Sequence, residues 1–306
     1  MTLLTWAPSQ GHTHAAQAQL WEGALVFVFE PPLEKAAVAL AQGVRRSAPL
    51  PGLPANVLAG GKISIYLAPD PAAFDSLAPG APDWSAGIAY PEGDRIVLPT
   101  FAPRAGGIPL GAVLRHELAH IALRRYLGAG VPRWFHEGYA ELATGGWGLQ
   151  EAWALRLAIL AGRMPRLESL SLDFRREHLG ARHAYLLAYT AVELLHRIGG
   201  PSGFTRLLER WRELGALDPA IRRTYGLTLG QYERVWREEV RDRFGWLLLV
   251  SQAVVSWTLL TMLVLVLGYW KRKRDRRKLA ALRSMESVAA YEDSPWAEID
   301  ENEEQT

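Results

Sequence analysis

The stretch VLRHELAHIALRR, residues 113–125, limits the possible folds most strongly, because it sets two histidines four positions apart. At that spacing His116 and His120 lie on one face of a helix, so both imidazoles can bind one metal ion. Glu117 lies about 100° around the helix from His116 and can approach a water molecule at the metal without binding the metal. This H-E-x-x-H pattern is typical of two zinc ligands and a general base on one helix.

A catalytic zinc site needs a third protein ligand and one open position, and the segment PRWFHEGYAEL, residues 132–142, offers that ligand. A short turn between two antiparallel helices would bring Glu137 beside the two histidines. Glu141 lies one helical turn further on and is placed to accept a hydrogen bond from the second nitrogen of a ligand histidine. We expect His136, in contrast, to point elsewhere on its helix.

The composition of the chain excludes several classes of protein. Its 306 residues include no cysteine, which excludes disulfides, thiolate metal sites and cysteine nucleophiles. The net charge is only +2, and this gives no basis for a nucleic-acid partner. Apolar residues make up 49% of the chain, enough to build a core.

Apolar patterns divide the chain into a β-rich first part and a helical second part. Residues 24–29 and 62–68 favour strands, residues 86–99 predict a hairpin around Pro-Glu-Gly-Asp, and helices are expected at 32–47 and 71–78. Glycine and proline then separate a series of helices, at 110–126, 134–144, 149–160, 181–198, 202–214, 218–225 and 228–244. We therefore predict an α+β fold, in which a small mixed β-sheet subdomain is followed by a helical subdomain, with the active-site helix between them.

Residues 246–270 contain no charged residue, and this predicts one C-terminal transmembrane helix. Trp246 stands at one end and Tyr269 and Trp270 at the other, as aromatic rings do at the two membrane interfaces. A buried helix in a soluble core is the alternative, but such a helix would be expected to carry a polar face.

The basic cluster KRKRDRRK, residues 271–278, is expected to stay in the cytoplasm. This predicts a single-pass protein of the bacterial plasma membrane, with the domain of residues 21–245 outside and the C-terminus inside. Residues 1–20 are predicted to be flexible or part of a signal segment, although they lack the basic start of a signal peptide. A signal further upstream would resolve this conflict; without one, the domain would lie in the cytoplasm on a C-terminal anchor.

Residues 271–306 combine this basic juxtamembrane cluster with an acidic tail. After Arg283 the chain has eight Asp and Glu residues and no Lys or Arg. Such a composition predicts a disordered segment, which could bind a cytoplasmic partner.

The two motifs HELAH and PRWFHEGYAEL resemble those of the gluzincin metallopeptidases, which pair H-E-x-x-H with W-x-x-E-G-x-A. Over roughly residues 21–215 the chain is similar to the bacterial peptidase-MA-like family. By position, the resemblance implies His116, His120 and Glu137 as zinc ligands and Glu117 as catalytic base. Gluzincins often add a Tyr or His that stabilises the oxyanion, and Tyr185 and Tyr189 are the candidates here, unless they are core residues.

The expected function is that of a membrane-anchored zinc metalloendopeptidase that hydrolyses peptides with a zinc-activated water, while Glu117 acts as general base. By the same resemblance, the hairpin of residues 87–99 would supply an edge strand that pairs with the substrate.

Three other functions compete with this one. The first is a non-catalytic, membrane-tethered peptide-binding module on a peptidase fold, which would have no need of Glu117. The second is a structural or signalling membrane protein, whose zinc site would want four closed ligands. An intramembrane protease is disfavoured, because Arg115, Arg124 and Arg125 make the histidine helix too polar to span a membrane.

Overall fold

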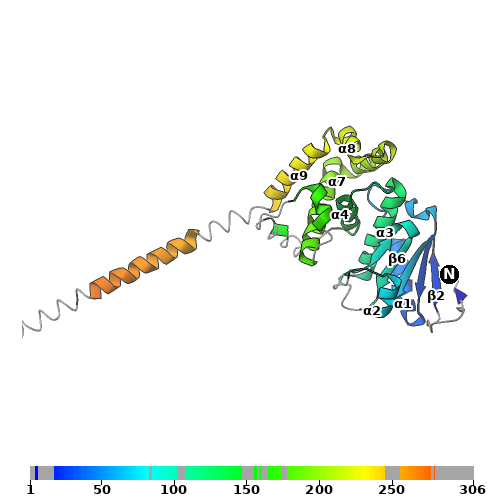
Figure 1. Ribbon diagram of the computed structural model, residues 1–306, viewed down its shortest axis with the longest axis horizontal. Coiled ribbons are helices and arrows are strands. Elements are labelled where there is room, and N and C mark those ends of the chain that lie inside the picture. The colour runs from blue at the N-terminus through cyan, green and yellow to red at the C-terminus, as the bar shows by residue number, and fades with distance from the viewer. Residues whose placement is uncertain are drawn as a thin grey trace, which may run out of the picture. The chain divides into compact units, whose positions relative to one another are not determined.

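The computed structural model divides the chain into two compact units, Met1–Gly245 and Trp246–Thr306 (Figure 1). The structure describes residues 4–5, 17–82, 85–101, 108–146, 155–156, 159, 165–173, 178–244, 256–276 and 279. Most of the helix predicted at 149–160 lies outside these residues.

Within the described residues of the first unit, six strands form one mixed sheet in the order β1-β2-β3-β4-β6-β5. Strand β3 is parallel to β4 and β4 to β6, whereas β1–β2, β2–β3 and β5–β6 are antiparallel pairs. This confirms the predicted mixed sheet. The strands are β1 (Leu4–Thr5), β2 (Ala18–Glu22), β3 (Leu25–Phe29), β4 (Ile63–Ala68), β5 (Ile88–Tyr90) and β6 (Arg95–Pro99).

Strand β2 begins three residues before the predicted start of the domain at Trp21, and Leu4–Thr5 pairs with it. The sequence does not indicate β2 because Leu20 is the one buried residue of this strand, so its apolar pattern is weak.

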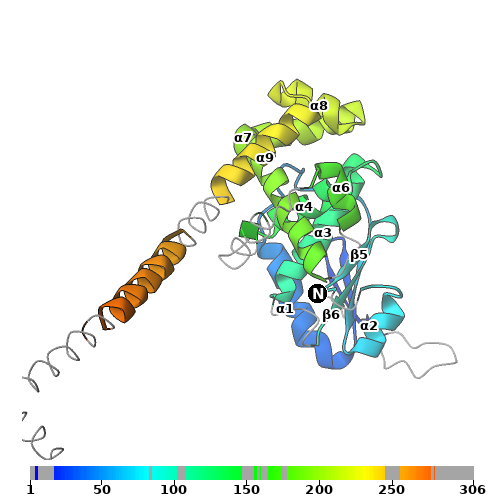
Figure 2. The same ribbon diagram turned by 60° about the vertical axis from the view of Figure 1, so that its left-hand side comes forward.

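Helices cover both faces of the sheet. Helices α1 (Glu34–Arg46) and α3 (Leu110–Leu127) pack on one face, where Leu40 and Leu118 share a core with Phe27 of the sheet. Helix α2 (Pro71–Leu77) covers the other face and buries Phe74 beside Val97 of β6. In Figure 2 α1 and α2 are seen on either side of the strands.

Short 3₁₀ turns connect these elements: η1 (Pro31–Leu33), η2 (Val57–Gly60) and η3 (Pro91–Gly93). The predicted hairpin at 86–99 is present, with η3 between β5 and β6. Asp94 closes this turn in the left-handed region at φ 46°. Arg125 of α3 binds both carboxylate oxygens of Asp94, at 3.0 and 2.8 Å, and so ties the hairpin to the histidine helix.

The second half of the unit is helical, with α4 (Arg133–Ala143), α6 (Leu167–Asp173), α7 (His178–Leu214), α8 (Leu217–Tyr225) and α9 (Leu229–Phe244). The helices predicted at 181–198 and 202–214 are the two arms of α7, which breaks at Gly200 (φ 61°) just before Pro201. Helix α9 is held on α7 by a hydrogen bond of 2.9 Å from the Trp236 indole Nε1 to Thr190 Oγ1.

Helix α3 lies between the two halves, as predicted (Figure 1). Its residues Leu114 and Leu118 belong to the sheet core, whereas Ala119 and Leu123 belong to the helical core. Because each fully buried leucine contributes about 1.5–3 kcal/mol, α3 is anchored on both sides and is a rigid support for His116 and His120.

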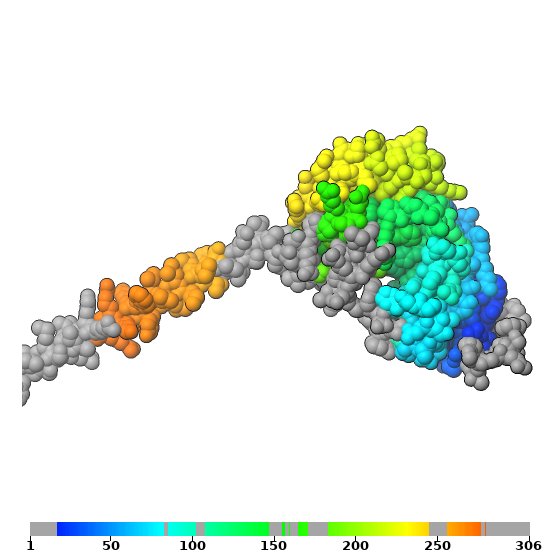
Figure 3. Space-filling model, in the orientation of Figure 1, coloured from blue at the N-terminus to red at the C-terminus, as the bar shows by residue number. Residues whose placement is uncertain are grey.

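The structure does not confirm the transmembrane helix predicted at 246–270. Of that segment, residues 246–255 lie outside the described residues. Among the residues that are described, no helix has both the length and the apolar character needed to cross a membrane. Residues 256–276 form a helix, which is orange in Figure 3. Its apolar side chains are exposed, and Trp257 and Leu265 are each 68% exposed.

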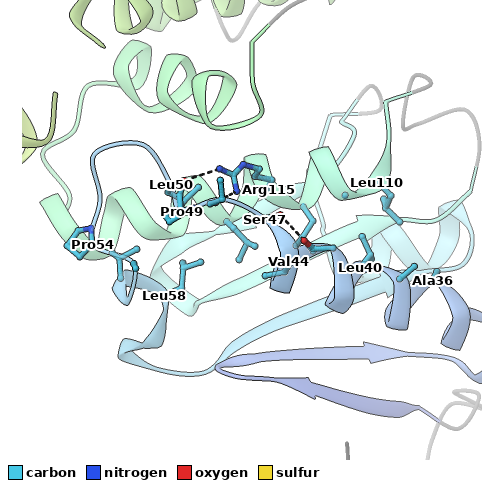
Figure 4. Close-up of a pocket in the computed structure, with 18 residues that line it drawn as sticks. Ala36, Leu40, Val44, Ser47, Pro49, Leu50, Pro54, Leu58, Leu110 and Arg115 are labelled. Atoms are coloured by element: carbon cyan, nitrogen blue, oxygen red, sulfur yellow. Dashed lines mark hydrogen bonds between the residues drawn. The ribbon is translucent and has the colours of Figure 1, made fainter. Parts of the chain in front are cut away.

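An apolar cavity of about 520 Å³ lies between α1, the loop of residues 47–58 and α3 (Figure 4). Leu114 and Leu118 line it from α3. At 3.6 residues per turn, each of these leucines lies about 200° around the helix from His116, on nearly the opposite side. The cavity is therefore separate from the face of α3 that carries the histidines.

Candidate metal centre

The turn between α3 and α4 brings three potential metal ligands together. His116 and His120 project from successive turns of α3, and Glu137 projects from the second turn of α4. The Nε2 atoms of the two histidines are 3.2 Å apart. The Glu137 Oε2 atom lies 3.4 Å from His120 Nε2 and 3.9 Å from His116 Nε2. The three residues are therefore one group that could hold a metal ion.

These separations fit a tetrahedral zinc ion. Zinc binds imidazole nitrogen and carboxylate oxygen at about 2.0–2.2 Å, so two ligand atoms of a tetrahedral site stand about 3.3–3.5 Å apart. The distances of 3.2 and 3.4 Å match this value, and the distance of 3.9 Å requires only a small side-chain movement. Two imidazoles and one carboxylate are also a ligand set of catalytic zinc sites, in which the fourth position is open.

The electrostatic surroundings give His116 and Glu137 the protonation states that metal ligands need. Burial lowers the pKa of His116 to about 3, so this imidazole is neutral at pH 7. Burial opposes the charged form of both Glu137 and His120, but their mutual attraction outweighs it. The pKa of Glu137 falls to about 2 and that of His120 rises. Glu137 is therefore ionised, and a bound cation would compete with a proton for the lone pair of His120.

Glu117 lies beside these ligands and contacts the edge strand of the sheet. Burial raises the pKa of its carboxyl group to about 7. The backbone N–H of Ala89 in β5 donates a hydrogen bond to this carboxyl group, which opposes the rise in pKa. The approach of β5 to α3 requires a glycine just before the strand. A Cβ atom at Gly87 would lie 2.7 Å from Val113 Cγ1 and 3.3 Å from Glu117 Cγ.

The second ring nitrogens of the two histidines face different residues of α4. His116 Nδ1 lies 3.8 Å from Glu141 Oε1, on the side that the sequence predicts but beyond hydrogen-bonding distance. His120 Nδ1 lies 3.0 Å from His136 Nδ1. The expectation that His136 points away from the site is therefore wrong, because α4 crosses α3 so closely that both His136 and Glu137 reach His120.

The ligand Glu137 has a further neighbour that sequence reasoning did not identify. Arg133 Nε lies 3.5 Å from Glu137 Oε1, whereas the distances to the two histidines are those of Oε2. The signal was present, since residues 133 and 137 are one helical turn apart and oppositely charged.

Helix α4 is held in place by its close approach to α7 at Gly138. A Cβ atom at this position would lie 2.6 Å from the carbonyl carbon of Ala188 and 2.8 Å from Val192 Cγ2. Only glycine allows the two helices to come so close, which explains why a glycine follows Glu137.

The two tyrosine candidates of α7 have different surroundings. Burial raises the pKa of Tyr185, and the charged groups that act on it next are Glu137, Arg133, Glu117 and Glu141. Burial also raises the pKa of Tyr189, but there the leading charges are Glu193 and Arg243. The Tyr189 ring instead packs against Gly146, where an added Cβ would lie 2.9 Å from its Cζ. Tyr185 therefore belongs to the surroundings of the metal centre.

Comparison with known families places the chain in a superfamily of peptidases. Residues 55–242, more than half of the chain, match the model of the Peptidase MA superfamily. The chain belongs to this superfamily. The match reaches into α9, beyond the residues that carry the sequence resemblance. Comparison with curated proteins finds no match.

Solved structures show a remote likeness. An M1 zinc metallopeptidase from Deinococcus radiodurans has a TM-score of 0.37 with 17% identity, and its form with a Tyr-Ser-Ala substrate has 0.38 with 17%. A two-domain M1 zinc metallopeptidase with bound L-tryptophan has 0.38 with 16%. In each case 77% of this chain is covered, and the chain spans about half (51%) of the other protein.

Proposed function

We propose that this protein is a zinc-dependent metalloendopeptidase, with His116, His120 and Glu137 as the metal ligands. The observation that carries this proposal is the convergence of two Nε2 atoms and one carboxylate oxygen at 3.2 to 3.9 Å, beside a buried Glu117. The membership in the Peptidase MA superfamily supports the same reaction.

Glu117 is the general base of the proposed reaction. When bound, zinc supplies Lewis acidity that makes water more acidic and polarises the peptide carbonyl. The Glu117 carboxylate accepts a proton from the attacking water and then donates it to the leaving amine. A pKa near neutrality suits both steps, because the group must bind and release the proton at the same pH.

Strand β5 is the proposed substrate-binding edge. It is the last strand of the sheet and pairs only with β6 among the described strands. The N–H of Ala89 points toward Glu117, and in an extended strand the C=O of the same residue points to the same side. An extended peptide can therefore pair with this edge, with its scissile bond beside Glu117.

Tyr185 is the proposed donor to the oxyanion, and Tyr189 is assigned to packing.

Membrane attachment through residues 246–270 is the second part of the proposal. Its support is the absence of any charge in this segment and the exposure of the apolar side chains at 256–270. Lipid is the proposed partner of this surface. We keep the orientation proposed from the basic residues 271–278, with the peptidase domain outside and the C-terminus in the cytoplasm, where the acidic tail could bind a partner.

The test compares Glu117→Gln with wild type on a quenched fluorescent peptide that is blocked at both ends. We expect Glu117→Gln to keep its zinc and to lose about 10²–10⁴-fold in kcat, because the base is gone while the ligands remain. His116→Ala should lose both zinc and activity. Glu92→Gln, a change of the same kind at an exposed carboxylate, should leave both unchanged.

Three results would count against the proposal or a part of it. Full cleavage by Glu117→Gln would exclude Glu117 as the base. A wild-type protein that binds zinc and the blocked peptide without cleaving it would instead favour the non-catalytic peptide-binding module. Cleavage restricted to peptides with a free amino terminus would retain the peptidase and reject the endopeptidase.

A further inference from the structure

His136 faces the outer nitrogen of one proposed zinc ligand at hydrogen-bonding distance. The rings of His120 and His136 have their centroids 5.2 Å apart and are tilted by 33°, and their Nδ1 atoms are separated by 3.0 Å. The other nitrogen of His120, Nε2, faces His116 Nε2 at 3.2 Å and Glu137 Oε2 at 3.4 Å. The two nitrogens of His120 thus have separate tasks, one toward the metal position and one toward α4.

A contact of 3.0 Å between two ring nitrogens requires one hydrogen between them, since two lone pairs would repel each other. The proposed function requires Nε2 of His120 to keep its lone pair for the metal. A neutral imidazole with a free Nε2 carries its hydrogen on Nδ1. His120 is therefore the donor, and His136 is the acceptor with its own hydrogen on Nε2.

We propose that His136 is a positioning residue that fixes the tautomer and ring orientation of His120 for metal binding. The proposal rests on the zinc site proposed above and adds to it an outer partner of unusual kind. Outer partners of zinc-bound histidines are carboxylates, backbone carbonyls or water in most sites, and here an imidazole takes that place. His116 differs, because its Nδ1 faces the Glu141 carboxylate at 3.8 Å.

Three variants distinguish the effect of the hydrogen-bond acceptor on zinc binding from the effects of side-chain size and polarity. His136→Asn places an amide oxygen close to where Nδ1 stands in histidine and so keeps an acceptor for His120. His136→Gln keeps the amide but carries it one bond further, toward the Nε2 position. His136→Phe keeps a ring of similar shape and has no acceptor.

The measurement is the zinc dissociation constant of the full-length metal-free protein, obtained by competition with a chromophoric chelator. Loss of an outer partner is expected to weaken zinc binding about 10–100-fold, so His136→Gln and His136→Phe should show this loss. The zinc dissociation constant of His136→Asn should stay within about threefold of the wild-type value, because this variant keeps the hydrogen bond. Equal zinc affinity in wild type, His136→Gln and His136→Phe would overturn the proposal. An equal loss of affinity in His136→Asn and His136→Gln would also overturn it.

A second readout uses the metal-free protein alone. Long-range ¹H–¹⁵N spectra of the histidine rings distinguish the Nδ1–H from the Nε2–H tautomer. At a pH above the pKa of His120, where its ring is neutral, we expect the hydrogen on Nδ1 in wild type and in His136→Asn, and a mixture of tautomers in His136→Gln. An Nε2–H tautomer in wild type would overturn the assignment of the donor. If wild type bound no zinc at all, the proposed function itself would fail, whereas zinc binding without any effect of position 136 would reject only the role of His136.

Discussion

At the scale of single residues, the chemistry of the site could be predicted from local spacing. The pair His116 and His120 with Glu117 between them is fixed by helix periodicity, and Glu137 follows from one assumed turn. The structure brings the two histidines and Glu137 together, and Glu117 interacts with His120 and Glu137. His136 could not be predicted, because its contact with His120 depends on the crossing of two helices, which no spacing within one helix encodes.

The two tyrosines of α7 give a prediction at this scale. Tyr185→Phe should lower kcat about 10²–10³-fold, because it removes one donor to the oxyanion, and should leave zinc content unchanged. Tyr189→Phe, the matched change one turn further along the helix, should alter kcat by less than about threefold. Steady-state kinetics on the blocked peptide provide the comparison. A larger loss in Tyr189→Phe than in Tyr185→Phe would reverse the assignment.

At the scale of elements, most helices and three strand regions could be predicted from their apolar period. The sequence predicts α3, α4 and both arms of α7 nearly to their ends, because glycine and proline mark those ends. Strand β2 and the strand order were not predicted. Both depend on pairing between distant segments, such as Leu25 with Ile63, and a pattern within one strand does not name its partner.

The contact between α4 and α7 gives a second prediction. Gly138→Ala should destabilise the protein by about 1–3 kcal/mol, because the added methyl group meets the Ala188 backbone and pushes α4 away. Zinc affinity should fall as well, since Glu137 moves with α4. Gly43→Ala in α1 is the matched control. Its Cβ would meet nothing within 4 Å, so it should stabilise by about 0.5–1 kcal/mol.

Urea unfolding of the metal-free proteins measures the first effect, and zinc titration measures the second. Equal stability of Gly138→Ala and wild type would show that α4 and α7 can separate without cost, and the support of Glu137 by this contact would then be rejected.

At the scale of the whole molecule, the unit Met1–Gly245 has its own core, and the helix of residues 256–276 has exposed apolar side chains. Composition alone suggested this division, since uncharged residues begin directly after α9. Where the unit resides in the cell was predicted from charge, and this remains a prediction.

Replacing Leu263 and Leu265 together by arginine tests the membrane attachment. Each arginine in the centre of a membrane segment costs about 2.5–3.5 kcal/mol of insertion free energy, so the double variant should move from the carbonate-resistant membrane fraction to the soluble fraction. Its zinc content should not change. Val235→Arg, at an exposed valine of α9, should leave the fractionation as in wild type. A wild-type protein that is released by carbonate would contradict the attachment.

The account as a whole depends on Glu137 as the third ligand, and the zinc content of full-length protein tests this most directly. After dialysis against zinc-buffered solution, wild type and Glu117→Gln should each retain one zinc ion per chain, because their three ligands are intact. Glu137→Ala and His120→Ala should retain less than about a tenth of that amount, given the loss of one ligand of three. A Glu137→Ala protein that holds zinc as firmly as wild type would contradict the proposed centre.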